Sequence, residues 1–116
     1  MEQINKVELV GVVGNSSTQN VGGRRITRFS VVTNRAYKDA MGEAKIEETW
    51  HNVSVWQGKA CPDPSVLQKG ARVQVFGRIR NTKVQNEGQP DRYYSEIQAR
   101  EVHLVSDKED MVAEMD

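Results

Sequence analysis

Residues 47–58 constrain the fold more than any other stretch, because they hold both tryptophans of the chain within one alternating pattern. One face of this pattern would carry Thr49, His51, Val53 and Val55, and the other would carry Trp50, Asn52, Ser54 and Trp56. A period of two predicts a strand with one buried face. On the second face, two large aromatic rings lie among small polar side chains. Either a flat ligand such as a nucleobase stacks on them, or a second layer of protein covers them, and this stretch alone leaves both interpretations open.

The composition is that of one small domain without disulfide bonds. With 116 residues the chain has room for a single core, and a hydrophobic share of 37% predicts that this core is thin. The single cysteine, Cys61, excludes an intrachain disulfide and a cysteine-rich zinc site. No apolar run is long enough to span a membrane or to form the core of a signal peptide. We therefore expect a cytoplasmic protein with no membrane partner.

The charge of the chain is unevenly distributed, although its formal total is zero. Residues 1–100 contain 15 Lys and Arg against 10 Asp and Glu, whereas residues 101–116 contain one lysine against six acidic residues. A basic body with an acidic tail is compatible with a nucleic-acid partner, which the net charge alone would argue against.

The rest of the pattern predicts four further strands and one short helix. The strands are expected at residues 6–14, 24–34, 72–80 and 93–105, and the helix at residues 64–68. A connection ending in a Gly22-Gly23 turn is expected at residues 15–23, and long hairpin loops at residues 35–45 and 81–90. Five strands with a short helix between the third and the fourth is the element order of the OB-fold, an all-β barrel. The barrel is expected to occupy residues 1–105 and an acidic tail residues 106–116.

The fourth predicted strand carries a second unusual surface. Its expected core face consists of Val73, Val75, Gly77 and Ile79. The opposite face would hold one aromatic ring among cationic and polar side chains, namely Arg72, Gln74, Phe76, Arg78 and Arg80. Rings alternating with cations are typical of grooves that hold single-stranded nucleic acid.

No catalytic or metal-binding constellation is visible. His51 and His103 lie on strand patterns outside any cluster with metal-ligand spacing. Glu47 and Glu48 are adjacent, so on a strand their carboxylates point to opposite faces and cannot act as an acid–base pair. The sequence also lacks a glycine-rich loop that could cradle a phosphate. We therefore expect no enzyme, no metal and no cofactor.

Aromatic and cationic residues instead recur together along the predicted strands and at the bases of the loops. Base stacking is expected at Trp50, Trp56, Tyr37 and Phe76, with Tyr93 and Tyr94 also present among the aromatics. Phosphate neutralisation is expected at Arg28, Arg35, Lys38, Arg72, Arg78, Arg80, Lys83 and Arg92. Taken singly, each cation would be a solvated surface charge and each tyrosine a strand-packing residue. Their joint alternation favours a groove for single-stranded DNA.

Several short motifs resemble one family. They are Asn-Lys-Val-Glu-Leu-Val-Gly at residues 5–11, Thr-Trp-His-Asn-Val at 49–53, Lys-Gly-Ala-Arg-Val at 69–73, Gly-Arg-Ile-Arg at 77–80 and Asp-Arg-Tyr at 91–93. In this order and at these distances they are similar to the bacterial-type single-stranded DNA-binding proteins. The resemblance covers residues 5–105, nearly the whole chain.

The resemblance implies an OB-fold that forms a homotetramer in the bacterial cytoplasm, associated with the nucleoid. Such a protein coats single-stranded DNA without sequence preference during replication, recombination and repair. At matching positions, it implies base stacking on Tyr37, Trp50 and Trp56. It also implies subunit contacts along the first strand, at Lys6, Val7 and Leu9, and near His51.

Three departures from the family pattern matter. Val84 stands where the family often has a tryptophan, so one stacking platform is expected to be missing, and Tyr37 stands where a tryptophan is frequent. The usual long linker and the acidic tip ending in Asp-Ile-Pro-Phe do not occur in the sequence. Recruitment of replication and repair proteins through such a tip is therefore unsupported.

Two alternatives remain open beside DNA coating. One is a dimeric interaction module like the primosomal replication protein, which the short tail favours and the Trp50 and Trp56 pair opposes. The other is an RNA-binding OB module, which the sequence does not separate from a DNA-binding one.

Overall fold

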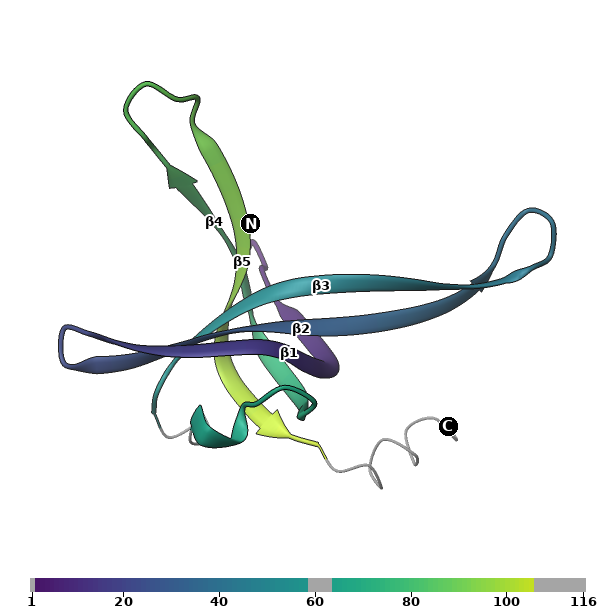
Figure 1. The fold of residues 1–116 in the computed structure, drawn as a ribbon, viewed down its shortest axis with the longest axis horizontal. Helices are drawn as coiled ribbons and strands as arrows, with labels where there is room; N and C mark the ends of the chain where they lie inside the picture. The colour runs from purple at the N-terminus through teal and green to yellow at the C-terminus, as the bar shows by residue number, and fades with distance from the viewer. Residues whose placement is uncertain (1, 59–63, 106–116) are drawn as a thin grey trace.

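The computed structural model describes residues 2–58 and 64–105. Cys61 and the expected acidic tail at residues 106–116 lie outside these ranges. Within them the fold is a closed five-stranded barrel with the strand order β1-β2-β3-β5-β4, which confirms the all-β prediction (Figure 1). The strands are β1 (Val7–Val21), β2 (Arg24–Lys38), β3 (Ala44–Trp56), β4 (Arg72–Val84) and β5 (Arg92–Leu104). All pairs are antiparallel except a short parallel contact of β3 with β5.

The core is a single cluster of branched aliphatic side chains with one aromatic ring. Alternate residues of β2 and β3, such as Phe29, Val31, Val53 and Val55, point inward, as a period of two requires. Leu67, which follows the one helical turn found among the described residues, is fully buried against the same cluster. The burial of Leu67 therefore anchors the short segment between β3 and β4 against the core of the barrel.

The first strand bends sharply and takes part in two ladders. Its first half pairs with β4 from Val7 to Val12, and its second half pairs with β2 from Val12 to Val21, with a register shift after Val13. Asn15 to Val21 was expected to be a connection, and that prediction is wrong. Despite its Ser and Asn content, this segment is a strand because β2 supplies backbone partners for it. The Gly22-Gly23 turn is confirmed, with φ angles of 58° and 82° that suit a type I′ hairpin turn.

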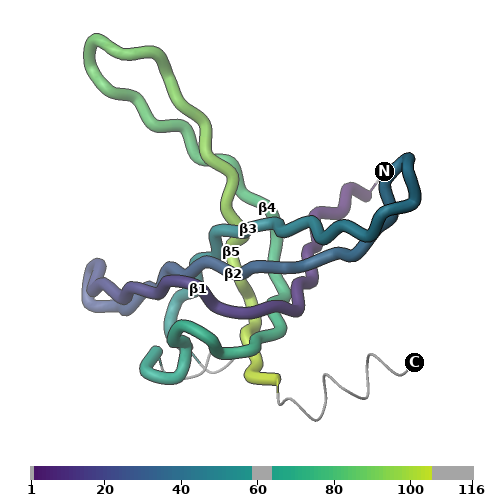
Figure 2. The backbone as a smooth tube through the Cα atoms, turned by 45° about the vertical axis from the view of Figure 1, so that its right-hand side comes forward, coloured from purple at the N-terminus to yellow at the C-terminus, as the bar shows by residue number. Residues whose placement is uncertain are grey.

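Two long β-hairpins project from the barrel as arms (Figures 1 and 2). We call them the β2–β3 arm and the β4–β5 arm. The expected loop at residues 35–45 is mostly strand, since β2 runs to Lys38 and β3 begins at Ala44. Likewise β4 continues to Val84 and β5 begins at Arg92, so the expected loop at 81–90 is shorter than predicted. In both cases paired backbone groups extend the ladder beyond the point where the core ends.

The turns at the ends of the arms follow the sequence signals. In the β2–β3 arm, the Asp39 carboxylate accepts hydrogen bonds from the backbone N–H groups of Met41 and Glu43, both at 2.9 Å. In the β4–β5 arm, the Gln89 N–H donates to the Asn86 carbonyl at 3.1 Å and closes a turn within the segment predicted to be a loop. Capping of backbone N–H groups by an Asp side chain and a four-residue turn that begins at Asn are both common ways to reverse the chain.

The predicted helix at residues 64–68 is only one 3-10 turn, Pro64–Val66. The Leu67 N–H donates to the Pro64 carbonyl at 3.1 Å. Gly70 follows soon afterwards, and its backbone is bonded to Val13 of β1. A segment this short cannot recover the cost of helix nucleation, so it stops after one turn. The described residues contain no helix long and apolar enough to cross a membrane.

Three side chains lie differently from the predicted alternation. Ile79 was placed in the core but is 51% exposed, because β4 has left the barrel there as part of an arm. Thr49, expected on the core face of β3, is exposed for the same reason in the β2–β3 arm. Ser54 was placed outward but is only 4% exposed, since β3 is flanked by both β2 and β5 at that point.

Gly77 allows the closest backbone approach in the barrel. It lies at the register shift between β4 and β5, opposite Ala99. A Cβ atom there would overlap the Gln98 carbonyl oxygen and lie 2.9 Å from the Ala99 Cα. Both neighbours are backbone atoms, which cannot turn aside as a side chain could.

We therefore predict that Gly77→Ala lowers the free energy of unfolding by about 1–3 kcal/mol, the usual cost of overpacking. Chemical denaturation at a fixed protein concentration measures this difference. Gly58→Ala is the matched control, because a Cβ at Gly58 meets no atom within 4 Å. Equal stabilities of the two variants would contradict the close approach.

Candidate nucleic-acid interface

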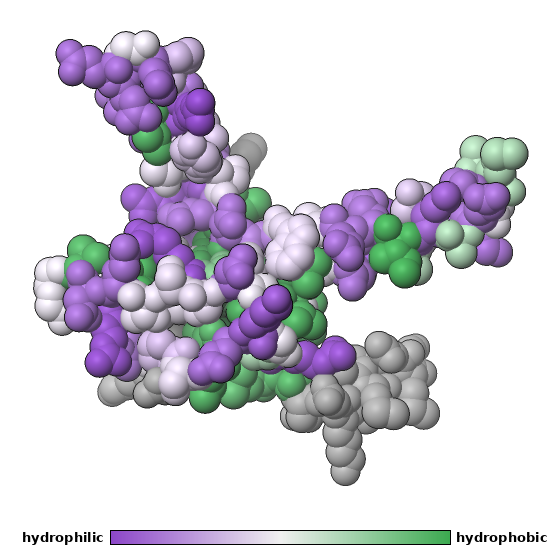
Figure 3. Space-filling model, viewed as in Figure 1, coloured by the Kyte–Doolittle hydropathy of each residue, from purple (hydrophilic) through white to green (hydrophobic). Residues whose placement is uncertain are grey.

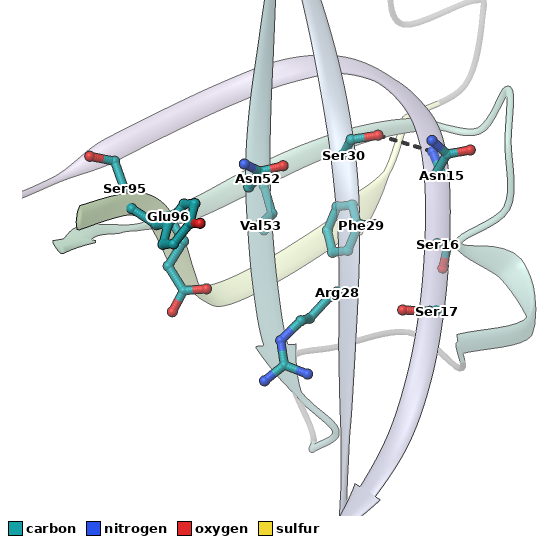
Figure 4. A pocket seen from close by; sticks show the side chains of 11 residues that line it. Asn15, Ser16, Ser17, Arg28, Phe29, Ser30, Asn52, Val53, Ser95 and Glu96 are labelled. Atoms are coloured by element: carbon teal, nitrogen blue, oxygen red, sulfur yellow. Dashed lines mark hydrogen bonds between the residues drawn. The ribbon is translucent and has the colours of Figure 1, made fainter. Parts of the chain in front are cut away.

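A groove of about 460 Å³ crosses the surface of the barrel where β1, β2, β3 and β5 meet. Its lining comes from four strands: Asn15, Ser16 and Ser17 of β1, Arg28, Phe29 and Ser30 of β2, Asn52 and Val53 of β3, and Tyr94, Ser95 and Glu96 of β5. Figure 4 shows the labelled side chains entering it from separate strands. Six of the eleven lining residues are serine or asparagine, so hydrogen-bonding groups lie next to apolar surface in this groove.

Strand register produces this hollow. Ser30 of β2 pairs with Asn52 of β3, so the two side chains share one face of the sheet. The Ser30 hydroxyl accepts a hydrogen bond from the Asn15 N–H at 3.0 Å (Figure 4). This bond joins β2 to β1 just where the register of β1 shifts.

Trp50 extends the same face toward the β2–β3 arm. It lies two residues before Asn52 on β3, and therefore on the same side of the strand. Its indole is 57% exposed. A Cβ atom at Gly14 would lie 2.5 Å from the indole Cζ3 and 2.8 Å from the Ser30 hydroxyl oxygen. Because Gly14 has no Cβ atom, the Trp50 indole can pack against β1 beside the groove. More than half of the side chain remains exposed and accessible to a ligand.

Trp56, at the end of β3, is half-buried and partly covered. The Arg24 guanidinium lies over its ring, 4.8 Å from the ring centroid. A cation in this position is attracted by the ring face. A base that stacks on Trp56 would have to displace Arg24 or use the other ring face.

Tyr37 and Phe76 lie away from the groove. Tyr37 pairs with Lys45 in the β2–β3 arm, and the register puts it on the face of the ribbon opposite to Trp50. Phe76 is half-buried between β1 and β5, with its ring edge-to-face against His103 at a centroid distance of 6.2 Å. It lines a second hollow with Lys6, Val7 and Arg78, and this hollow shares no lining residue with the groove. Tyr37 and Phe76 are therefore separated from Trp50, whereas Trp56 shares with Trp50 one side of β3 in the strand alternation.

Only one of the eight expected phosphate-binding cations lines the groove. Arg28 lies there and donates a hydrogen bond to the Gln19 side-chain oxygen at 2.8 Å. Five others belong to the two arms, namely Arg35 and Lys38 in the β2–β3 arm and Arg80, Lys83 and Arg92 in the β4–β5 arm. Lys83 is paired there with Asp91 at 3.2 Å.

The remaining two cations are elsewhere. The Arg78 guanidinium donates two hydrogen bonds to the Gln98 side-chain oxygen, at 3.1 and 2.8 Å, and lines the second hollow. Arg72 begins β4, and its carbonyl accepts a hydrogen bond from the Val105 N–H at 2.9 Å. Neither belongs to the groove or to an arm.

The residues expected in subunit contacts have roles within the chain. Val7 and Leu9 pack partly against the core, and the second edge of β1 before Val12 has no strand partner among the described residues. His51 Nε2 lies 3.0 Å from the Thr33 hydroxyl. Lys6 lines the second hollow.

Sequence reasoning missed much of the groove lining. Asn15, Ser16 and Ser17 were assigned to a connection, and Tyr94 was noted only as one aromatic among several. The alternation of Tyr94 and Glu96 on the fifth strand was a usable signal, because two residues at this spacing share a face. Among the described residues, no group of three or more His, Cys, Asp and Glu side chains could hold a metal ion.

Comparison with known proteins gives one consistent result. The family described as "Single-strand binding protein family" matches residues 4–105. The single-stranded DNA-binding protein of Xylella fastidiosa is 32% identical over 109 residues, which are 92% of this chain and 66% of that protein. Single-stranded DNA-binding protein 1 of Chlorobaculum tepidum is 26% identical over 109 residues, 91% of this chain and 67% of that protein. The chain thus spans about two thirds of the length of these relatives.

Solved structures agree on the fold. The Plasmodium falciparum SSB in complex with ssDNA matches with a TM-score of 0.75 at 25% identity, over 91% of this chain and 98% of that one. A deletion mutant of the single-stranded DNA binding protein from Thermus aquaticus matches with a TM-score of 0.74 at 18% identity, over 90% of this chain and 52% of that one. The second likeness bears on the fold alone.

The packing of the Trp50 indole against Gly14 can be tested without any ligand. In a Trp56→Phe background, which leaves Trp50 as the only tryptophan, we predict that Gly14→Ala shifts the fluorescence emission to longer wavelength and increases quenching by acrylamide. The added methyl group pushes the ring away from β1 and into water. Far-UV circular dichroism should remain that of the parent. Unchanged emission and quenching would show that the indole does not rest on Gly14.

Proposed function

The chain belongs to the single-strand binding protein family, and we propose that it binds and protects single-stranded DNA without sequence preference during replication, recombination and repair. The observation that carries this proposal is the exposed indole of Trp50, which lies beside a groove containing serine and asparagine side chains, on a barrel from which two arms bearing cations project. The proposed activity is binding, and it involves no enzymatic step. The setting that we propose is the bacterial cytoplasm, at the nucleoid.

Stacking on Trp50 would supply affinity that is independent of base identity. Every base has a π-face, and one stack on an aromatic side chain contributes about 1–3 kcal/mol. The hydroxyl and amide groups of Ser30 and Asn52 lie on the same face and can accept or donate to whichever base edge is presented. A rigid barrel strand holds these groups in place, so binding does not have to order them first.

The arms would supply the phosphate contacts. Arg28 lies in the groove and five further cations lie on the arms: Arg35, Lys38, Arg80, Lys83 and Arg92. Because the arms extend away from the barrel (Figure 3), these charges can follow a flexible strand farther than a compact surface could. Neutralised phosphates release counterions, which makes the affinity dependent on salt.

Self-association is the second part of the proposal. The unpaired edge of β1 before Val12 offers backbone N–H and C=O groups to a second copy, as exposed strand edges do. We infer a homotetramer built on such pairing, with Lys6 and the His51 region near subunit contacts and a dimer as the smaller alternative. Contacts with replication and repair proteins are no part of this proposal.

Titration with oligo-dT tests the proposal directly. We predict that the tryptophan fluorescence is quenched at low salt, and that the affinity falls with a log–log salt slope of about −4 per protomer, from six contacts at about −0.7 each. A folded protein whose fluorescence does not change would contradict DNA binding. If a matched RNA oligomer competes better than DNA, the partner is RNA.

Trp50→Ala should weaken oligo-dT binding by about 1–3 kcal/mol, the value of one lost stack, with little effect on folding. Leu104→Ala is the control, since Leu104 is a comparably exposed apolar side chain at the end of β5 and does not line the groove. An unfolded Trp50→Ala variant would show that the indole belongs to the core. Equal binding by both variants would remove Trp50 from the DNA path.

A further inference from the structure

Two aromatic side chains line the groove, and of these Phe29 is buried in the core whereas Tyr94 is exposed. Tyr94 lies on β5 within the β4–β5 arm, opposite Thr82 of β4, and is 51% exposed. The facing part of the groove comes from Arg28 and from residues 15–17 of β1. An exposed ring in a hollow of this size presents a flat apolar surface to whatever enters it.

The neighbouring tyrosine provides an internal comparison. Tyr93 is 69% exposed, but successive residues of a strand point to opposite faces, and Tyr93 does not line the groove. Its cross-strand partner is Lys83, which is ion-paired with Asp91. The two tyrosines therefore differ in location while sharing chemistry and exposure.

The groove carries opposite charges on different strands, with Glu96 on β5 and Arg28 on β2. Glu96 lies two residues after Tyr94, on the same side of β5, and lines the groove. Its carboxylate repels a phosphate, whereas the Arg28 guanidinium from β2 attracts one. Figure 4 shows Arg28 and Glu96 reaching the groove from different strands. Arg80 is the ladder partner of Glu96, but it does not line the groove. Within the groove itself, a phosphate is therefore expected nearer to Arg28 than to Glu96.

We propose that Tyr94 is a base-stacking residue of this groove, so that one nucleobase of bound single-stranded DNA lies on its ring while the adjoining phosphate faces Arg28. This rests on the proposed function and adds a second stacking subsite to that of Trp50. The two rings lie on different strands, β3 and β5. Single-stranded DNA that stacks on both rings therefore crosses the groove instead of following one arm.

The test compares four variants in oligo-dT titrations read by tryptophan fluorescence, which none of the substitutions removes. Tyr94→Ala and Tyr94→Leu should bind about fivefold to a hundredfold more weakly than the parent. Tyr94→Phe should bind as the parent does, because the ring remains. Tyr93→Ala should also bind as the parent does, because Tyr93 is outside the groove. Circular dichroism and melting curves accompany each titration.

The outcomes separate this inference from the function on which it rests. If the parent protein itself leaves the fluorescence unquenched, the proposed function fails. If the parent binds and Tyr94→Ala and Tyr94→Leu bind equally well, or Tyr93→Ala weakens binding as much as they do, the Tyr94 subsite is overturned. If Tyr94→Ala does not fold, Tyr94→Leu against Tyr94→Phe decides, and equal affinities of that pair overturn the stacking role.

Discussion

The double pairing of β1 is the constraint on which the rest of the structure depends. The first half of β1 pairs with β4 and its second half pairs with β2. Because one strand forms both ladders, the sheet can close into a barrel only if β1 bends. Gly11 lies at that bend, and a Cβ atom there would overlap the Val32 carbonyl oxygen. In the closed barrel, only the inner halves of the β2–β3 and β4–β5 hairpins take part in the barrel wall. The excess length of these hairpins becomes the two arms.

The groove follows from the same geometry. The register of β1 shifts between Val13 and Ser16, and this places Asn15, Ser16 and Ser17 beside Ser30 and Arg28. Gly14, within the shifted segment, makes room for the Trp50 indole. The bend that closes the barrel thus also brings the Trp50 ring and the groove next to each other. Both rest on ladder-bonded strands, which keeps the platform ordered before a ligand arrives.

The barrel could be predicted from sequence because a period of two is a local signal. Residues 47–56 and 72–77 show it clearly, and the structure confirms strands there. Residues 15–21 were taken for a connection because they are rich in Ser and Asn, and residues 35–45 and 81–90 were taken for loops around Gly42 and Gly88. Whether such segments pair as strands depends on the partner strand and not on their own composition. Ile79 and Thr49 were assigned to the wrong environment, since strand alternation does not reveal where a hairpin leaves the core. The Tyr94 wall of the groove required the barrel closure that brings β5 next to β3.

We propose that single-stranded DNA crosses the barrel face that holds Trp50, Ser30 and Asn52. Two-dimensional ¹⁵N–¹H NMR spectra of the isotopically labelled protein, recorded during an oligo-dT titration, test it most directly. We expect the largest shift changes at the Trp50 indole N–H and at the backbone amides of Ser30 and Asn52. If these signals stay in place while the amides of Glu8 and Phe76, beside the second hollow, shift instead, the DNA path has been assigned to the wrong side of the barrel.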